Sequence, residues 1–266
     1  MTSAVTGKTS DSGPQYDHSR SPAVRFGLEY TRRTYLITIR PSLERGIVDH
    51  GWLKSHHSFS FASYRDPKHI HFGPLLVINE DHFAPGRGFG MHPHEDMEIV
   101  TYIVAGELEH KDTAGGGGIL RAGDVQRMSA GMGVEHSESN ASVDHWLHLL
   151  QVWIMPKSKG ITPRYGEKHF TDEQKHNRLQ AIVSRDGRDG SLEIHQTAEI
   201  YAAKFTDSSE VHALEAGRMA YVQLISGHLV VNGTDIKQGD AIKVQDEDGV
   251  MIAGTGHFLL FDLPKG

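Results

Sequence analysis

The sequence contains no cysteine, and this absence removes several kinds of chemistry at once. Disulfide scaffolds, thiolate metal sites, iron–sulfur clusters and cysteine nucleophiles all need a thiol. Any bound metal must therefore be held by histidine and carboxylate side chains. The chain has 19 histidines, so imidazole donors are plentiful.

Long hydrophobic runs and an excess of positive charge are missing too. No apolar stretch approaches the roughly 20 residues of a membrane-spanning helix, and the first 30 residues lack the hydrophobic core of a secretory signal. The net charge of −7, without a basic run, argues against contact with nucleic acid or an anionic membrane. A Gly-x-Ser-x-Gly elbow of serine hydrolases is also absent. We expect a cytoplasmic protein.

Short β-rich runs dominate what is present, and clusters of Gly, Pro and Asp separate them. This spacing is typical of an all-β sandwich or barrel, and 266 residues at about 150 per domain indicate two domains or one doubled domain. Residues 1–35 are polar without a hydrophobic period, so we expect a disordered N-terminal tail. The predicted strands lie in 35–39, 75–78, 98–104, 148–155, 220–225, 228–231 and 257–263.

An internal repeat supports the doubling. The stretch 101–108, followed by Gly123-Asp124, has the same layout as 222–229 followed by Gly239-Asp240. The economical interpretation is two similar small barrels, in residues 36–160 and 181–266. A connecting segment, 161–180, would join them and contain the only helix of any length, Thr171 to Leu179.

The strongest chemical signal is a pair of histidines at the head of a β-rich run. Side chains alternate faces along a strand, so His92 and His94 share one face, together with Asp96 and Glu98 if the strand continues. About 40 residues later, His136 and Glu138 again share a face. If the two strands are neighbours, three imidazoles and at least one carboxylate converge on one point, a set that suits Fe(II), Ni, Cu, Mn or Zn.

A single His-x-His pair in a histidine-rich chain is more often a pair of surface residues than a metal site. The same spacing occurs at His69 and His71, where no second His-x-Glu strand accompanies it, and we expect those two to be structural. His56-His57 and the histidines of 145–148 have no distinguishing spacing. The combination with His136 and Glu138 is what favours His92 and His94.

These residues resemble the two sequence motifs of the cupins. The matching residues are Gly86, His92, His94, Glu98 and Gly106 in the first motif and Gly123, Gly131, His136 and Asn140 in the second. Ser129 replaces the usual Pro of the second motif, and His136 lies two residues late. Both departures are found in pirins, a family of double cupins, which the chain resembles from about Leu36 to Pro264. The stretches that carry this resemblance are 50–53, 57–61, 92–94, 129–131, 136–138 and 160–165.

The resemblance implies two cupin-like (double-stranded β-helix, jelly-roll) barrels and one divalent transition metal per chain. In pirins the ligands correspond to His92, His94, His136 and Glu138, whereas the general cupin pattern would use Glu98. We expect Glu98 to lie inward, behind the ligands. Fe(II) is the favoured metal; Ni, Cu, Mn, Co and Zn also fit. Because imidazoles coordinate only when deprotonated, affinity should fall below about pH 6.5.

Three functions are compatible with such a site. Some bacterial pirins resemble flavonol 2,3-dioxygenases in activity, so the first is dioxygen-dependent cleavage of a small aromatic or enolic substrate such as quercetin, with Glu138 accepting a substrate proton. The second is a non-enzymatic, iron-binding redox sensor that acts through a protein partner. The third, a sugar-phosphate isomerase, would need a basic cluster, and only Arg87 and Arg127 lie near the ligands in sequence.

The second barrel is expected to bind no metal. Aligning Gly106 with Gly227 places Ala213 and Glu215 at the positions of His92 and His94. Aligning Gly123 with Gly239 places Ile252 and Gly254 at the positions of His136 and Glu138. His212 would then be one residue out of register and face the opposite side of the strand.

Overall fold

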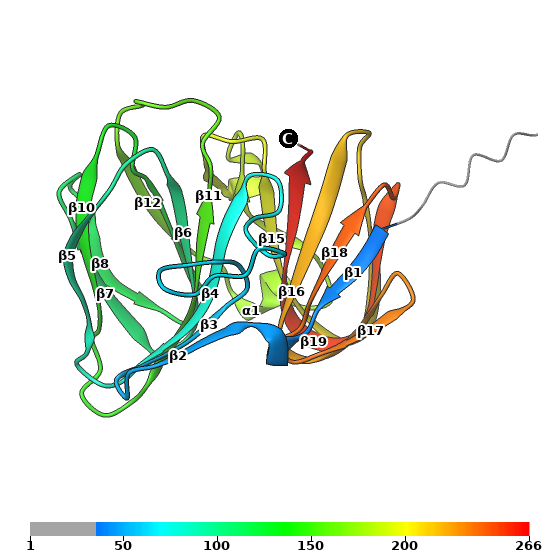
Figure 1. The fold of residues 1–266 in the computed structure, drawn as a ribbon, viewed down its shortest axis with the longest axis horizontal. Coiled ribbons are helices and arrows are strands. Elements are labelled where there is room, and N and C mark those ends of the chain that lie inside the picture. Colours follow the sequence, from blue (N-terminus) through cyan, green and yellow to red (C-terminus); the bar gives the residue numbers. More distant parts are fainter. Residues whose placement is uncertain (1–35, 266) are drawn as a thin grey trace, which may run out of the picture. The chain divides into compact units, whose positions relative to one another are not determined.

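The computed structural model describes residues 36–265, and nearly all of its regular structure is β-strand (Figure 1). The predicted all-β class is confirmed, and every predicted run overlaps a strand, but the two runs 220–225 and 228–231 form one continuous strand. Residues 1–35, where we expected a tail, lie outside the described part. The first half contains η1 (Ser42–Glu44) and the strands β1 (Leu36–Arg40), β2 (Gly46–Asp49), β3 (Leu53–His57), β4 (Leu75–Phe83), β5 (Gly88–His94), β6 (Glu98–Ala105), β7 (Glu107–Asp112), β8 (Gly117–Arg121), β9 (Asp124–Ser129), β10 (Val134–Asn140) and β11 (Leu147–Ile154).

The second half repeats this pattern with longer strands. Its elements are β12 (Arg164–His169), α1 (Asp172–Lys175), β13 (Gln180–Ser184), η2 (Arg188–Gly190), β14 (Leu192–Glu193), β15 (Glu199–Ala213), β16 (Arg218–Val231), β17 (Thr234–Lys237), β18 (Ala241–Gln245) and β19 (Gly249–Pro264). None of the helices in the described part is long and apolar enough to cross a membrane.

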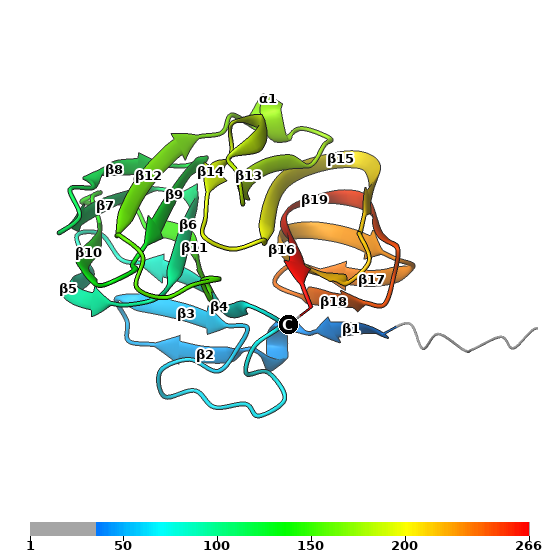
Figure 2. The same ribbon diagram turned by 90° about the horizontal axis from the view of Figure 1, so that it is seen from above.

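The first barrel is built from two sheets, which Figure 2 shows from above. One sheet has the order β12-β9-β6-β11-β4-β3-β2, and the other has the order β5-β10-β7-β8. Side chains along β10 alternate between buried and less buried positions, as expected of a strand with one face inside a barrel. This alternation directs every second side chain of β10 into the barrel.

The second barrel is one continuous sheet in the order β1-β18-β16-β19-β15-β13-β14, with β17 paired to β16. Its strands β15, β16 and β19 run unbroken where the first barrel has the pairs β4/β5, β6/β7 and β10/β11. The repeat glycines support this match, because Gly106 and Gly227 both have positive φ, at 85° and 97°. The internal repeat inferred from the sequence therefore reflects two copies of one strand arrangement.

The strand pairing moves two of the expected domain boundaries. Strand β1, expected in the first barrel, pairs with β18 of the second. Strand β12, which lies in the expected connecting segment 161–180, pairs with β9 and so belongs to the sheet of the first barrel. The expected helix Thr171 to Leu179 shortens to α1, four residues long, with Thr171 as its N-cap in a capping box with Gln174.

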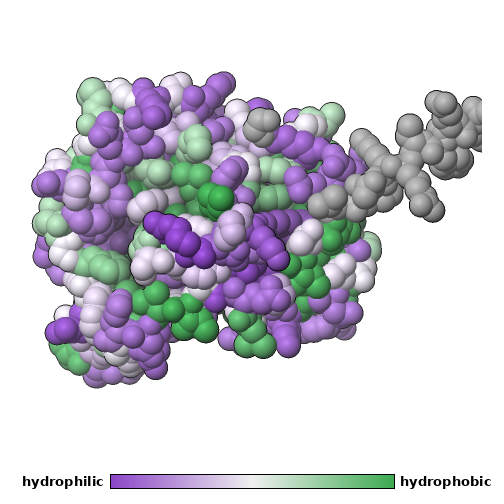
Figure 3. Space-filling model, viewed as in Figure 1, coloured by the Kyte–Doolittle hydropathy of each residue, from purple (hydrophilic) through white to green (hydrophobic). Residues whose placement is uncertain are grey.

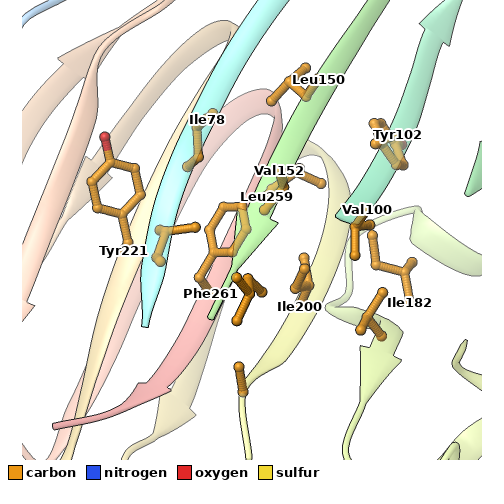
Figure 4. Close-up of a cluster of buried hydrophobic side chains, with 14 of the residues drawn as sticks. Ile78, Val100, Tyr102, Leu150, Val152, Ile182, Ile200, Tyr221, Leu259 and Phe261 are labelled. Carbon is orange, nitrogen blue, oxygen red and sulfur yellow. The ribbon is translucent and has the colours of Figure 1, made fainter. Parts of the chain in front are cut away.

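The two barrels pack against each other through a shared hydrophobic core. Ile78 and Val152 of the first barrel and Tyr221 and Phe261 of the second belong to one buried cluster (Figure 4). A separate cluster fills the interior of the second barrel with apolar side chains, among them Val222, Leu224, Ile252, Phe258 and Leu260. The interior of the first barrel, in contrast, contains buried polar side chains, and the candidate site lies there.

Candidate metal centre

Three imidazoles meet inside the first barrel. His92 and His94 come from β5 and His136 from β10, and the antiparallel register places His136 directly opposite His92. Each of the three offers a ring nitrogen within 4.8 Å of the other two. The Nε2 atoms of His94 and His136 lie 2.9 Å apart, so one of them donates a hydrogen bond to the other.

Burial favours the neutral form of two of these imidazoles, those of His94 and His136. It lowers the pKa of His136 to about 2, with a contribution from His92, and the pKa of His94 to about 4. The backbone fixes the tautomer of the third ring: Nδ1 of His92 lies 2.8 Å from the carbonyl oxygen of Gly90 and donates to it, which leaves Nε2 with its lone pair. Imidazole nitrogens directed at one point suit a transition metal.

Glu138 adds a carboxylate to this group from the same strand as His136. One of its oxygens lies within 4.8 Å of a ring nitrogen of His136. Gln151 donates a 2.7 Å hydrogen bond from Nε2 to Glu138, and the Thr101 hydroxyl lies 3.4 Å from its other oxygen. Burial raises the pKa of Glu138 to about 7, and the nearby carboxylate of Asp81 adds to the effect. The donor set thus holds three imidazoles and one carboxyl group whose ionised form burial disfavours.

His110 is a further potential ligand beside this centre, and sequence analysis missed it. It lies on β7 opposite Glu138 and forms a second group of potential ligands with His136 and Glu138. Its Nε2 donates to Asp112, 2.9 Å away, and its ring stacks on Tyr165. The available signal was alternation, because His110 shares a face with the buried Leu108, but no second histidine at that strand drew attention to it.

Asp96 and Glu98 do not join the cluster. The chain turns between β5 and β6, where Asp96 has a φ of 48°, so the alternation that begins at His92 does not continue to Glu98. Asp96 accepts a hydrogen bond from the backbone of Gly160. Glu98 is buried at the start of β6 and accepts a 2.7 Å hydrogen bond from Ser129. Both carboxylates lie outside the two groups of potential ligands found among residues 36–265.

The remaining histidine pair of the same spacing also lies elsewhere. Nδ1 of His69 is 3.2 Å from the ammonium of Lys243, and Nδ1 of His71 donates to the backbone oxygen of Gly73. Neither ring belongs to the two groups of potential ligands in the described part of the chain.

A cavity of about 580 Å³ opens beside the histidines. Its apolar wall is mainly aromatic, with Trp52, Phe61, Phe89 and Trp153. Trp153 packs edge-on against His94, with the ring centres 4.9 Å apart. The polar side chains that line the cavity are His50, Ser55, His57, Ser63, Asn79, Asp81, His92, His94, Glu138 and Gln151. Flat aromatic walls with a few polar groups suit a planar, polyhydroxylated molecule.

Comparisons with known proteins agree with this geometry. The family model described as Pirin matches residues 39–154, and the model described as Quercetinase C-terminal cupin domain matches residues 181–263. A protein of Escherichia coli K12 named quercetin 2,3-dioxygenase is 44% identical over 232 residues, which cover 86% of this chain and 99% of the relative. The chain belongs to the pirin family.

Solved structures of pirins support the same relationship. The crystal structure of YhhW from Escherichia coli has 44% sequence identity and a TM-score of 0.83, with 87% of this chain and 99% of that chain covered. A second structure, described as the bacterial pirin YhhW in complex with nickel(II), matches with 43% identity and the same TM-score. A quercetin 2,3-dioxygenase of Acinetobacter baumannii, at 22% identity and a TM-score of 0.69, shares the fold.

The second barrel of this pirin presents different side chains at the corresponding place. Strand β15 ends at Ala213, so Glu215 lies beyond it, and the sequence-based register was wrong on this side. His212, expected on the outer face, has Nε2 2.8 Å from Asp262, which lies on the same face of β19 as the core residues Phe258 and Leu260. His212 therefore points inward.

Apart from Asp262, the described part of β19 that pairs with the end of β15 places no ligating side chain beside His212. Val250, Ile252 and Gly254 of β19 pair with the end of β15, and the last two also pair with β16. None of the three has a side-chain atom that can bind a metal. Among residues 36–265, both groups that could hold a metal lie in the first barrel of the pirin.

Proposed function

We propose that this pirin is a mononuclear metal-dependent dioxygenase that cleaves flavonols, with quercetin as the test substrate. The observation that supports the proposal is a pair of donor groups that share His136, one with His92 and His94 and the other with His110 and Glu138. His92, His94 and Glu138 also line the aromatic-walled cavity. The name of the Escherichia coli relative, quercetin 2,3-dioxygenase, points to the same reaction.

The residues present fit a divalent transition metal. Neutral imidazoles and a carboxylate are suitable ligands for Fe(II) and Ni(II), and three neutral donors with one carboxylate would leave a formal charge of +1. The raised pKa of Glu138 supports this fit, because a cation at this position would restore the ionised form that burial disfavours. We propose Fe(II) as the native metal, with Ni(II) as the alternative that the nickel complex of YhhW supports.

A metal held by these residues would lower the pKa of a substrate hydroxyl and leave coordination positions for the substrate and dioxygen. The protein residues supply the rest of the chemistry. Glu138 can accept the substrate proton, because its carboxyl group lines the cavity and would be ionised beside a bound cation. The side chain of Gln151 holds that carboxylate in place and is itself bound by the hydroxyl of Thr101 at 2.7 Å. The aromatic walls orient a planar substrate and exclude water.

The proposal is tested by the loss of the flavonol absorbance band. Protein loaded with Fe(II) or Ni(II) should consume quercetin in air and release carbon monoxide, and it should do neither under anaerobic conditions. The metal-free protein is the control. Quercetin that persists in air with metal-loaded protein would contradict the enzymatic proposal and favour a redox-sensing protein that acts through a partner.

A protein partner stays a prediction from the sequence. On the face shown in Figure 3, hydrophobic residues are interspersed with hydrophilic ones. The cytoplasmic location expected from the sequence stays a prediction.

A further inference from the structure

Two polar side chains in the wall of the cavity have atoms that make no hydrogen bond of good geometry. Asp81 on β4 and Ser55 on β3 face each other across the strand pair, and both line the cavity beside Glu138. Asp81 is 6% exposed and Ser55 is 2% exposed. Within residues 36–265, neither Oδ1 of Asp81 nor Oγ of Ser55 makes a hydrogen bond of good geometry. The two interact with each other, since the Ser55 hydroxyl lies close enough to lower the pKa of the Asp81 carboxyl. Most buried polar groups in proteins are paired, so this pair needs an explanation.

Polar residues next to Asp81 and Ser55 on the same two strands are paired, both on the cavity side and on the opposite face. Two residues along the same strands, His57 lies opposite Asn79, and its Nδ1 donates a 2.6 Å hydrogen bond to the Asn79 side chain. The residue before Asp81, Glu80, binds Arg45 at 2.7 Å and His148 at 3.0 Å. The lack of well-formed hydrogen bonds is therefore local to Asp81 and Ser55 and is not a general property of these strands.

A third cavity residue has the complementary character. Nε1 of Trp153 is buried without a hydrogen-bond partner in the described part of the chain, and an indole N–H can only donate. An ionised carboxylate can only accept, and a hydroxyl can do both. In addition to the proposed metal, the cavity thus offers a planar ligand two hydrogen-bond acceptors, Asp81 and Ser55, and one hydrogen-bond donor, Trp153.

We propose that Asp81 and Ser55 bind a phenolic hydroxyl of the substrate on a ring that does not contact the metal. This inference rests on the proposed function and specifies its substrate class, namely flavonols that carry hydroxyl groups beyond the one next to the ring carbonyl. The carboxylate of Asp81 accepts the phenolic hydrogen, and Ser55 completes the site. The cost of burying a poorly paired carboxylate in the free protein is offset when the substrate binds.

The first test measures binding without turnover. Ni(II)-loaded protein is titrated anaerobically with quercetin and with 3-hydroxyflavone, which keeps the metal-binding hydroxyl and carbonyl but lacks the other hydroxyl groups. Quenching of tryptophan fluorescence reports binding, because two of the three tryptophans line the cavity. We expect Asp81→Ala to weaken quercetin binding by about tenfold or more and to leave 3-hydroxyflavone binding within about twofold.

Variants at the serines supply a matched control. Ser55→Ala should reduce the preference for quercetin in the same direction as Asp81→Ala. Ser58→Ala removes another buried hydroxyl just beyond β3, one that binds Gln223 and does not line the cavity, and it should not change the preference.

A stability measurement separates this role from a structural one. Asp81→Asn keeps the shape of the side chain and removes the buried charge, so the melting temperature of the metal-free protein should hold or rise at pH 8. A clear fall would show that Asp81 stabilises the fold, and it would overturn the inference.

The outcomes also distinguish the inference from the proposed function. Selective binding without turnover would support the hydroxyl site and contradict the dioxygenase. If the wild-type protein turns quercetin over, but Asp81→Ala weakens the binding of quercetin and 3-hydroxyflavone equally or weakens neither, only the hydroxyl site is contradicted. Absence of flavonol binding by the wild-type protein would contradict both.

Discussion

Replacement of Glu138 by Gln should change how metal affinity depends on pH. Burial raises the pKa of Glu138 from 4.5 to about 7, which corresponds to about 3 kcal/mol against the ionised form in the metal-free protein. The protonated acid is a poor ligand, so affinity should fall as the pH drops through 7. The imidazoles of His94 and His136, with pKa values of about 4 and 2, add little to this loss above pH 5. This differs from the sequence-based expectation, which attributed the pH dependence to histidine.

The size of the effect follows from the pKa of Glu138. Competition by a single proton at pH 7 predicts about tenfold weaker binding at pH 6 and about a hundredfold weaker binding at pH 5, both relative to pH 8. The amide of Glu138→Gln does not titrate, so the decrease in metal affinity that protonation of Glu138 causes should disappear. The variant should also bind at least about tenfold more weakly at pH 8, since even residues behind the ligands contribute that much.

Equilibrium dialysis against Ni(II) between pH 5 and pH 8, followed by elemental analysis, measures both effects. Glu98→Gln is the matched control, because it makes the same chemical change at a buried glutamate of the same barrel that lies outside the donor groups. Its pH dependence should equal that of the wild-type protein. The assignment of Glu138 as a ligand would be refuted if the metal affinity of Glu138→Gln depended on pH as steeply as that of the wild-type protein. A weaker pH dependence of metal affinity in Glu98→Gln would refute it too.

Three further predictions concern the metal and the buried carboxylates. The double variant His92→Ala, His94→Ala should lose its metal by elemental analysis while its far-ultraviolet circular dichroism stays that of a β protein, and full metal retention would contradict the assigned ligands. Wild-type protein should hold about one ion per chain, and His212→Ala should leave that content unchanged, whereas two ions reduced to one would place a second site in the second barrel. Because burial raises the pKa of Asp81 from 3.8 to about 6, the free energy of unfolding should decrease as the pH rises from about 4 to about 6, and chemical denaturation should show that Asp81→Asn reduces this decrease.

Local sequence patterns were sufficient for most of the fold. The glycine and Gly-Asp repeat identified the two barrels because turns with positive φ leave a local record in the sequence, as at Gly106 and Gly227. The pairing of β1 with β18 joins residues about 200 positions apart, and no local pattern encodes it. The boundary between the barrels was misplaced for the same reason.

The candidate site was predictable only where strand alternation held. His136 and Glu138 follow each other on one strand, and the structure places both inside the barrel, as expected. The prediction that Glu98 shares the face of His92 and His94 was wrong, because a turn at Asp96 separates the two strands. Asp81 lies in the cavity through the pairing of β3 with β4, which sequence spacing does not reveal.

The central claim, that this pirin is a dioxygenase, is tested most directly by isotope labelling. Metal-loaded protein is supplied with quercetin and oxygen-18 dioxygen, and the cleaved product is analysed by mass spectrometry. A dioxygenase that expels one ring carbon as carbon monoxide should place both labelled oxygen atoms in the product. A product with one labelled atom or none, or no product at all, would contradict the account.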